Sequence, residues 1–101
     1  MDKKVKEKWV KQQVVKLLKD RGAYYFYPVA SGYMSSGVPD IVVCYQGLFM
    51  GIECKAGSNK PTAIQEKNLQ QIRDNKGVAM VVNEDNLVAL QNFLDHMEEW
   101  Q

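Results

Sequence analysis

The sequence predicts an α/β fold in which a mixed sheet is flanked by helices, in the order helix, three strands, helix, strand, helix. Three observations favour it. The first twenty residues show helical periodicity, two apolar runs are joined by Gln46-Gly47, and a short apolar run at residues 78–82 lies between two amphipathic segments. A chain of 101 residues is long enough for one modest core, so we expect a single domain over residues 1–101.

Three segments carry the helical spacing of apolar residues. The first, residues 3–20, is followed by Gly22, a residue that suits a helix C-cap. The second covers about residues 62–75 and ends at Gly77, and the third covers about residues 84–99. The apolar stripes of the first and third helices are Val10, Val14, Val15, Leu17 and Leu18, and Leu87, Leu90, Phe93, Leu94 and Met97.

Strands are expected where β-branched, aromatic and other apolar residues run together: residues 23–29, 38–45, 48–55 and 78–82. Pro28 interrupts or ends the first of them, because proline cannot donate a ladder hydrogen bond. Gln46-Gly47 is a two-residue turn between the second and third. The segments 30–37 and 56–61 are loops by composition.

The hairpin around Gln46-Gly47 brings three charged residues together. With a two-residue turn, the numbers of cross-strand partners add up to 93, so Asp40 lies opposite Glu53. Strand alternation places Lys55 on the same face, diagonal to Asp40. The residues behind them on this face are Val42, Cys44, Phe49 and Gly51, and those on the other face are Ile41, Val43, Met50 and Ile52.

Two carboxylates directly opposite each other on a sheet repel. A divalent cation removes that conflict, and Mg²⁺ takes one or two carboxylates while keeping waters and bridging to phosphate oxygens. A neighbouring lysine is suited to orient or deprotonate an attacking water and to stabilise charge on a phosphate. A partly exposed ion-pair network at the end of the sheet is the alternative. The apolar runs around Asp40 and Glu53 favour the metal.

Glu7 and Gln65 are two further candidates. Glu7 lies eleven residues before Leu18 and therefore at nearly the same helix azimuth, on the side that faces the core. A glutamate that only favours the start of the helix is the alternative. Gln65 is turned inward on its helix, but with Thr62 it also fits the S/T-x-x-E/Q capping box, and both interpretations stay open.

Charge is unevenly distributed along a chain whose net charge is +1. Residues 1–21 carry eight Lys or Arg against three Asp or Glu, a balance of +5, whereas residues 84–101 carry five acids and no Lys or Arg, a balance of −5. The basic end is either a phosphate-facing surface or the solvated side of an amphipathic helix.

No apolar run approaches the roughly 18 residues that span a bilayer, and the charged N-terminus has no apolar core of a signal peptide. We therefore expect a cytoplasmic protein with no membrane partner. Cys44 and Cys54 lie in apolar runs and are expected to be small core residues rather than a disulfide. With the distant His96 they make no zinc pattern, and we assign His96 no role beyond that of a surface histidine.

Three motifs carry a resemblance to a known family: Gly37-Val38-Pro39-Asp40, Glu53-Cys54-Lys55 and Pro61-Thr62-Ala63-Ile64-Gln65. They resemble the PD-(D/E)xK nuclease superfamily and, within it, the VRR-NUC (virus-type replication-repair nuclease) family, from Glu7 to about Val82. A bare ExK is a weak signal. The twelve residues between Asp40 and Glu53, and a Gln ten residues beyond the Lys, make the set more specific.

The resemblance implies a restriction-endonuclease-like core with a site for Mg²⁺ or Mn²⁺ held by Asp40 and Glu53. It also implies that Lys55 is the catalytic lysine and that Gln65 positions water or phosphate. Glu7 would match the acid on the family's first helix.

The resemblance to the nuclease family also concerns Cys54 and the loop that follows it. The resemblance implies that the backbone carbonyl of Cys54 is a further metal ligand, although its side chain stands where the family usually has a β-branched residue. Because that side chain points to the core, the chemistry should not change. The 56–61 loop is less basic than is common and leaves Lys60 as its main phosphate contact.

Some members of the family are domains of large repair nucleases, and others are short proteins of bacterial viruses that look like Holliday-junction resolvases working as homodimers. The chain is similar to the second kind, which implies a structure-selective DNA endonuclease on four-way junctions, in a host cytoplasm if viral. A chain of this size offers one active site, and two symmetric cuts need a twofold dimer. Trp9 and Trp100 are either interface anchors or residues that pack on their own core.

A catalytically silent DNA-binding or assembly module is the alternative from another class, and a flap or restriction-type nuclease is the alternative within the same class. Every motif position is filled, which argues against a silent module. No helix rich in Arg and Asn is visible for reading bases. We expect phosphate contacts from the first helix and the two loops, by Lys4, Lys8, Lys11, Tyr33 and Lys60.

Overall fold

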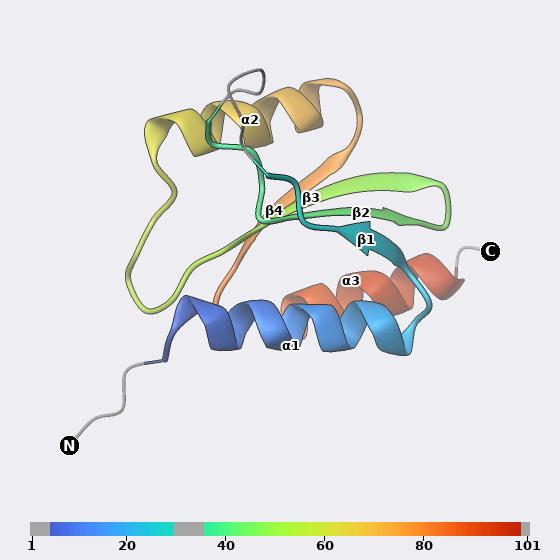
Figure 1. Cartoon of the computed structure of the whole chain (residues 1–101). Helices are drawn as coiled ribbons and strands as arrows, with labels where there is room; N and C mark the ends of the chain where they lie inside the picture. The colour runs from blue at the N-terminus through green and yellow to red at the C-terminus, as the bar shows by residue number, and fades with distance from the viewer. Residues whose placement is uncertain (1–4, 30–35, 100–101) are drawn as a thin grey trace.

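Seven elements follow one another in the computed structural model, which describes residues 5–29 and 36–99 (Figure 1). They are α1 (Glu7–Asp20), β1 (Tyr24–Phe26), β2 (Ile41–Tyr45), β3 (Leu48–Cys54), α2 (Ala63–Asp74), β4 (Val78–Val82) and α3 (Leu87–Glu99). The order and the class, an α/β fold with a mixed sheet flanked by helices, confirm the prediction from the sequence.

The four strands lie in the order β1-β2-β3-β4. The first three are antiparallel, while β4 runs parallel to β3 and is reached through α2, as a parallel connection requires. Ile41 pairs with Ile52 and Tyr45 with Leu48, which is the register predicted from the turn. Gln46 and Gly47 both have positive φ, 54° and 81°, the backbone that a two-residue hairpin of type I′ needs.

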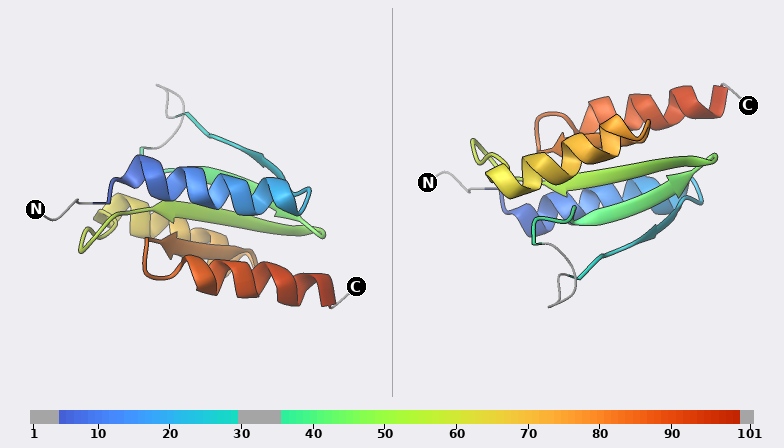
Figure 2. Two further views of the ribbon diagram at one scale, coloured as in Figure 1. Left: turned by 90° about the horizontal axis from the view of Figure 1, so that it is seen from below. Right: turned by 90° about the horizontal axis from the view of Figure 1, so that it is seen from above.

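The hydrophobic core fills the space between one face of the sheet and the helices α1 and α3. Figure 1 shows these two helices on one side of the sheet and α2 on the other, and Figure 2 shows α1 and α3 along the same face. Because strand side chains alternate, every second residue of β2 and β3 enters this core. Its buried members are Val10, Val14, Leu18, Ile41, Val43, Tyr45, Met50, Ile52, Cys54, Val82, Leu90 and Leu94.

Three elements begin three or more residues later than the sequence predicts, and at β2 and α3 the reason is local. At α1, residues 5 and 6 are not helical and Glu7 is the first helical residue. At β2 the strand begins at Ile41 rather than at residue 38, since Pro39 has no N–H to offer a ladder. At α3 the side chain of Asn83 accepts hydrogen bonds from the backbone N–H groups two and three residues later, which forms a turn before Leu87.

Cys44 is exposed, and the expectation that both cysteines are core residues was wrong for it. It pairs with Phe49 on the sheet face that points away from the core, where α2 packs over β3 and β4. Cys54 is buried as expected, and both thiols are free. Among the helices that the structure describes, none is long and apolar enough to cross a membrane.

Gly37 sets how closely the segment before Asp40 approaches α2. Its φ of +84° lies in the left-handed region, and a Cβ there would lie 2.9 Å from the carbonyl carbon of Ile64 and 3.0 Å from the backbone nitrogen of Gln65. Only glycine permits both the conformation and the contact. The loop therefore rests directly on the first turn of α2, which fixes the point where the chain enters β2.

Replacing Gly37 by alanine tests this close approach. Gly47 has nearly the same φ, +81°, but a Cβ there meets nothing within 4 Å. Gly47→Ala should therefore cost only the left-handed backbone, about 1–2 kcal/mol of unfolding free energy. Gly37→Ala should cost about 1–3 kcal/mol more, because the added methyl group is forced against α2. Urea unfolding of the two variants measures the difference, and equal losses would show that the loop does not rest on the helix.

Candidate active site

Asp40 lies one residue before β2 and continues its pairing with β3 through the side chain. Its Oδ2 accepts a hydrogen bond of 2.9 Å from the backbone N–H of Cys54. The last paired residues of the hairpin are Ile41 and Ile52, so the next position along the ladder places Asp40 beside Glu53, as predicted. The carboxylate is thus held by the strand next to it rather than by a mobile loop.

Glu53 is almost completely buried, with 2% of its surface exposed. Among the side chains that the structure describes, no other charged one is buried. Its Oε1 has no hydrogen-bond partner among the described residues. A buried carboxylate oxygen without a partner is costly, so its persistence in a stable fold needs a reason.

Two neighbours act in opposite directions on the ionisation of Glu53. Burial and then the negative charge of Asp40 raise the pKa of the Glu53 carboxyl above its ordinary value of 4.5. The ammonium group of Lys55 and a hydrogen bond with the backbone of Asp40 lower it, but burial prevails. A positive charge placed near both acids would favour their ionised forms.

Lys55 follows Glu53 on the same face of the strand. Its Nζ lies 3.4 Å from Oε2 of Glu53, and its side chain is only 12% exposed. Its backbone N–H donates to the carbonyl of Val82 at 2.9 Å, so the pairing of β3 with β4 extends to this residue. The sheet therefore fixes the backbone of Asp40, Glu53 and Lys55, and the three charges predicted to meet do so.

The two carboxylates fit a cation that keeps part of its water shell. Among the residues that the structure describes, no three His, Cys, Asp or Glu side chains come together, so a fully protein-made cage for the ion does not form there. Mg²⁺ is commonly held by one or two carboxylates with waters and substrate phosphates completing its shell. Asp40, and Glu53 with its unpartnered Oε1, supply the two carboxylates for such a site.

Gln65 forms the capping box. The side-chain oxygen of Gln65 accepts from the backbone N–H of Thr62 at 2.8 Å, and Thr62 Oγ1 accepts from the N–H of Gln65 at 3.2 Å. Of the two interpretations left open by the sequence, the structure realises the helix cap. The capping box uses the amide oxygen of the Gln65 side chain and not its NH₂ group.

Glu7 is exposed, and the expectation that it faces the core was wrong. It has the azimuth of the buried stripe but is the first helical residue, so it projects past the end of the core. Its charge and that of Lys11 are among the weaker influences on the thiol of Cys54, which places both near this end of the sheet. Burial, followed by the charge of Asp40, raises the pKa of that thiol to about 12, which disfavours the reactive thiolate form of Cys54.

The loop after Lys55 is tied to a residue that the sequence did not point out. Both carboxylate oxygens of Glu84 accept from the backbone N–H of Gly57 at 3.0 Å. The two residues are 27 positions apart, and no motif links them. Because β4 ends beside β3, Glu84 meets this loop only in the folded chain. It therefore positions the segment that carries Lys60, which is exposed.

A hollow of about 610 Å³ runs along α1 beside Tyr27, and we call it the basic groove. Lys11 places its Nζ 4.4 Å from the centre of the Tyr27 ring, a cation–π contact. Lys4 and Tyr33, also predicted to contact DNA, and Trp100 lie outside the described residues. Trp9 is 43% exposed. The lysines that line the groove are Lys8, Lys11, Lys16 and Lys19.

Comparison with known proteins gives one family. The family model described as archaeal Holliday junction resolvase (Hjc) matches residues 2–97, almost the whole sequence. A search of curated proteins found no significant match. The match supports the nuclease superfamily expected from the motifs, but it does not single out the VRR-NUC family. With its acids and lysine assembled at the end of the sheet, the chain belongs to the archaeal Holliday junction resolvase family of nucleases.

Proposed function

We propose that the chain is a metal-dependent, structure-selective DNA endonuclease that cuts four-way junctions as a homodimer. The observation that carries the proposal is the buried Glu53, which lies beside Asp40 and Lys55 and whose Oε1 has no hydrogen-bond partner among the described residues. A purely structural ion pair would satisfy both carboxylate oxygens. The membership of the resolvase family supports the junction as substrate. One chain carries one such site, so two symmetric cuts need two copies.

Asp40, Glu53 and the carbonyl of Cys54 are the groups that would hold Mg²⁺ or Mn²⁺. Such an ion, when bound, polarises the scissile phosphate and lowers the pKa of a coordinated water. One oxygen of Asp40 already accepts a hydrogen bond from the Cys54 N–H, so the carboxylate is oriented before any ion arrives. Glu53 supplies a carboxylate whose Oε1 has no hydrogen-bond partner among the described residues.

Lys55 is proposed to act on the phosphate and the attacking water. Its ammonium group is held beside Glu53 and is largely shielded from solvent, which strengthens its electrostatic effect. Gln65 uses its oxygen for the helix cap, and we assign its NH₂ group to the water or phosphate. Glu7 would assist from the rim of the site, where it is exposed.

We assign the DNA backbone to the basic groove. The first helix presents its lysines along one side of this hollow, starting near the active site at Lys8 and Lys11 and continuing to Lys16 and Lys19. Lysines on one face neutralise phosphates without reading sequence, which suits a structure-selective enzyme. Lys60 would contribute a further phosphate contact from the loop after the catalytic lysine.

We also propose a cytoplasmic location, a viral origin and the narrower VRR-NUC assignment. The composition and the three motifs support them.

Cleavage of a synthetic four-way junction tests the function directly. With Mg²⁺ or Mn²⁺ the wild type should make paired nicks across the junction, and EDTA should abolish them. Lys55→Ala should lower the rate by about 10²–10⁴-fold, the usual contribution of a positioned acid–base group. Lys67→Ala, on the exposed side of α2, is the control and should cut at the wild-type rate.

The other substrates in that assay decide between the alternatives. Preferred cutting of flaps or linear duplex would keep the nuclease but remove the junction assignment. Junction binding without cleavage in either metal would indicate the silent DNA-binding module.

The buried carboxylate of Glu53 predicts that the folding stability of the metal-free protein depends on pH. Because the folded state raises the pKa of Glu53 above 4.5, the folded chain holds this proton more tightly than the unfolded chain. The contribution of Glu53 to the free energy of unfolding is therefore present at low pH and is lost as the pH rises through the raised pKa. Glu53→Gln should lack that loss, and Mg²⁺ should restore stability at higher pH to the wild type only.

Urea unfolding between about pH 5 and pH 8, in EDTA and in Mg²⁺, measures both effects. Glu66→Gln, an exposed glutamate of α2, is the control and should follow the wild type. The same pH profile in wild type and Glu53→Gln would contradict a role for the buried charge.

The basic groove predicts a change in the salt dependence of DNA binding. Lys16→Gln with Lys19→Gln removes two cations from the groove far along α1 from the catalytic lysine. The slope of log K against log salt should fall in magnitude by about 1.8, at about 0.9 for each lost phosphate contact. Fluorescence anisotropy in EDTA from about 0.05 to 0.2 M salt measures it. Lys67→Gln with Lys76→Gln is the matched pair, and equal slopes for both pairs would place DNA elsewhere.

A further inference from the structure

The end of β3 carries the candidate site, and β4 lies parallel beside it. The last backbone bond between the two runs from the N–H of Lys55 to the carbonyl of Val82, at 2.9 Å. In a parallel ladder the next bond would join the N–H of Gly57 to the backbone carbonyl of Glu84. Here the carboxylate of Glu84 accepts that hydrogen bond instead, with both oxygens 3.0 Å from the Gly57 nitrogen. A side chain therefore continues the sheet by one step beyond the candidate catalytic lysine.

The turn after β4 makes Glu84 a firm support. The side chain of Asn83 accepts from the backbone N–H groups of Asp85 and Asn86, at 2.9 and 3.1 Å. The side chain of Asn86 accepts from the N–H of Asn83 at 2.7 Å and donates to a carbonyl of β4 at 2.8 Å. These bonds form a turn directly after the strand and tie it to β4. The backbone of Glu84 lies within this turn, so its carboxylate reaches the end of β3 from a fixed point.

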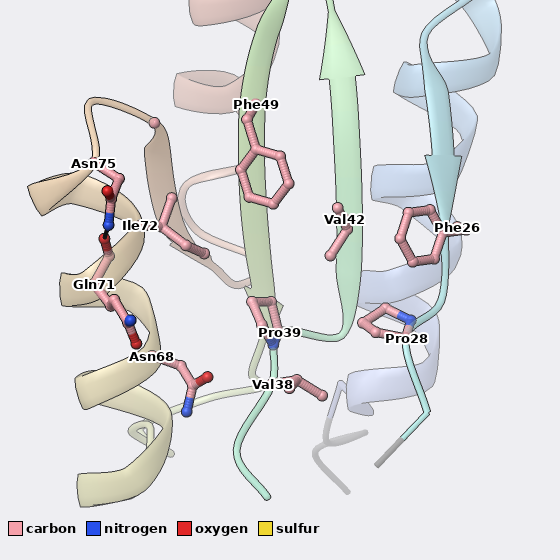
Figure 3. A pocket seen from close by; sticks show the side chains of 11 residues that line it. Phe26, Pro28, Val38, Pro39, Val42, Phe49, Asn68, Gln71, Ile72 and Asn75 are labelled. Atoms are coloured by element: carbon pink, nitrogen blue, oxygen red, sulfur yellow. Dashed lines mark hydrogen bonds between the residues drawn. The ribbon is translucent and has the colours of Figure 1, made fainter. Parts of the chain in front are cut away.

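The other side of β3 is held in a similar way. Oδ2 of Asp40 accepts from the N–H of Cys54 at 2.9 Å. Pro39, which lines the groove of about 450 Å³ between α2 and β1 shown in Figure 3, lies so close to Gly51 that a Cβ there would be 3.0 Å from its Cγ. The end of β3 therefore runs between two carboxylates, Asp40 on the side of β2 and Glu84 on the side of β4. The first belongs to the proposed metal site, whereas the second binds the backbone.

We propose that Glu84 is a positioning residue for the cleavage reaction, which holds the end of β3 so that Lys55 stays beside Glu53 and the scissile phosphate. The inference rests on the proposed function, because it concerns the same site. The bond to Val82 holds the N–H of Lys55 itself, and the bond to Glu84 holds the N–H two residues later. The backbone is thus fixed against β4 on both sides of the lysine.

A carboxylate suits this task better than a neutral side chain does. Hydrogen bonds to ionised acceptors are stronger than those between neutral groups, and either oxygen of Glu84 can accept from the same N–H. Its negative charge contacts the loop that carries Lys60, where a DNA phosphate is expected, and it repels that phosphate. A residue suited to DNA binding alone would not be acidic here. The charge agrees with a role in holding the backbone.

A glutamate that only favours the start of α3 is the alternative. Glu84 precedes Leu87, the first residue of α3, by three positions, and acids near a helix N-terminus are favoured by the helix dipole. Asp85 is closer to the helix, is exposed and carries the same charge. It takes part in the turn through its backbone N–H. Asp85→Ala is therefore the matched control, because it removes the charge and keeps the contact with Gly57.

Junction cleavage by wild type, Glu84→Ala, Glu84→Gln and Asp85→Ala tests the proposal. With Mg²⁺ and saturating enzyme, Glu84→Ala should cut about 10- to 100-fold more slowly than wild type, because a small displacement of a reacting group is costly. It should bind the junction in EDTA at least as tightly, since it loses a charge that repels phosphates. Glu84→Gln keeps an acceptor oxygen and should recover at least part of the rate. Asp85→Ala should cut at the wild-type rate.

Amide hydrogen exchange of the metal-free protein measures the contact without DNA. In Glu84→Ala the N–H of Gly57 should exchange at least about 10-fold faster than in wild type, since a hydrogen bond to a charged group stabilises by that factor or more. The N–H of Lys55 should follow it to a smaller extent. The N–H of Val43, in the buried core, should exchange as in wild type, which shows that the variant is folded.

Three results would overturn the inference: an unchanged rate in Glu84→Ala, a loss of rate that Glu84→Gln does not reduce or that Asp85→Ala reproduces, and an unchanged exchange at Gly57. In each of them a wild type that cuts junctions leaves the proposed nuclease intact. A wild type that cuts no DNA removes the nuclease and with it the role in cleavage. Faster exchange at Gly57 and Lys55 in Glu84→Ala would then still keep Glu84 as the residue that holds the end of β3.

Discussion

Glu53 places a carboxylate where almost no water reaches it, at the end of the two central strands and one residue from core side chains on either side. The surrounding structure holds it there without fully satisfying it. Asp40 lies beside it and repels it, and Lys55 pairs with only one of its oxygens. In a fold of this size such an arrangement costs stability that a bound ligand can return. The sheet, the hairpin and the close approach of Gly37 to α2 all serve to keep these groups in place.

Most of the fold and the centre of the site could be predicted because they depend on local rules. Side chains alternate along a strand, and a two-residue turn determines which residues face each other. Asp40, Glu53 and Lys55 followed from these two facts. The core stripes of α1 and α3 followed equally from the helical repeat, since Val10, Val14 and Leu18, like Leu90 and Leu94, are buried as expected.

The remaining features depend on how far one element reaches over another, and a single sequence does not contain that information. Alternation gave the correct face for Cys44, but only the position of α2 decides that this face is open. The azimuth of Glu7 was correct, but its burial depends on where the core ends. Gln65 suits a helix cap and a site at once, and the competition is decided by the hydrogen bond with Thr62. Glu84 reaches Gly57 only through the parallel strand.

The hairpin also limits how such a site can change during evolution. The twelve residues between Asp40 and Glu53 are two arms of five and a turn of two. One residue inserted into a single arm would turn every later side chain of β3 to the other face, so that the buried acid would enter the hydrophobic core and Cys54 would take its place. Adding one residue to each arm keeps both acids on their face. Descendants of this chain can therefore lengthen this hairpin in steps of two, and odd steps survive only if a β-bulge absorbs the extra residue.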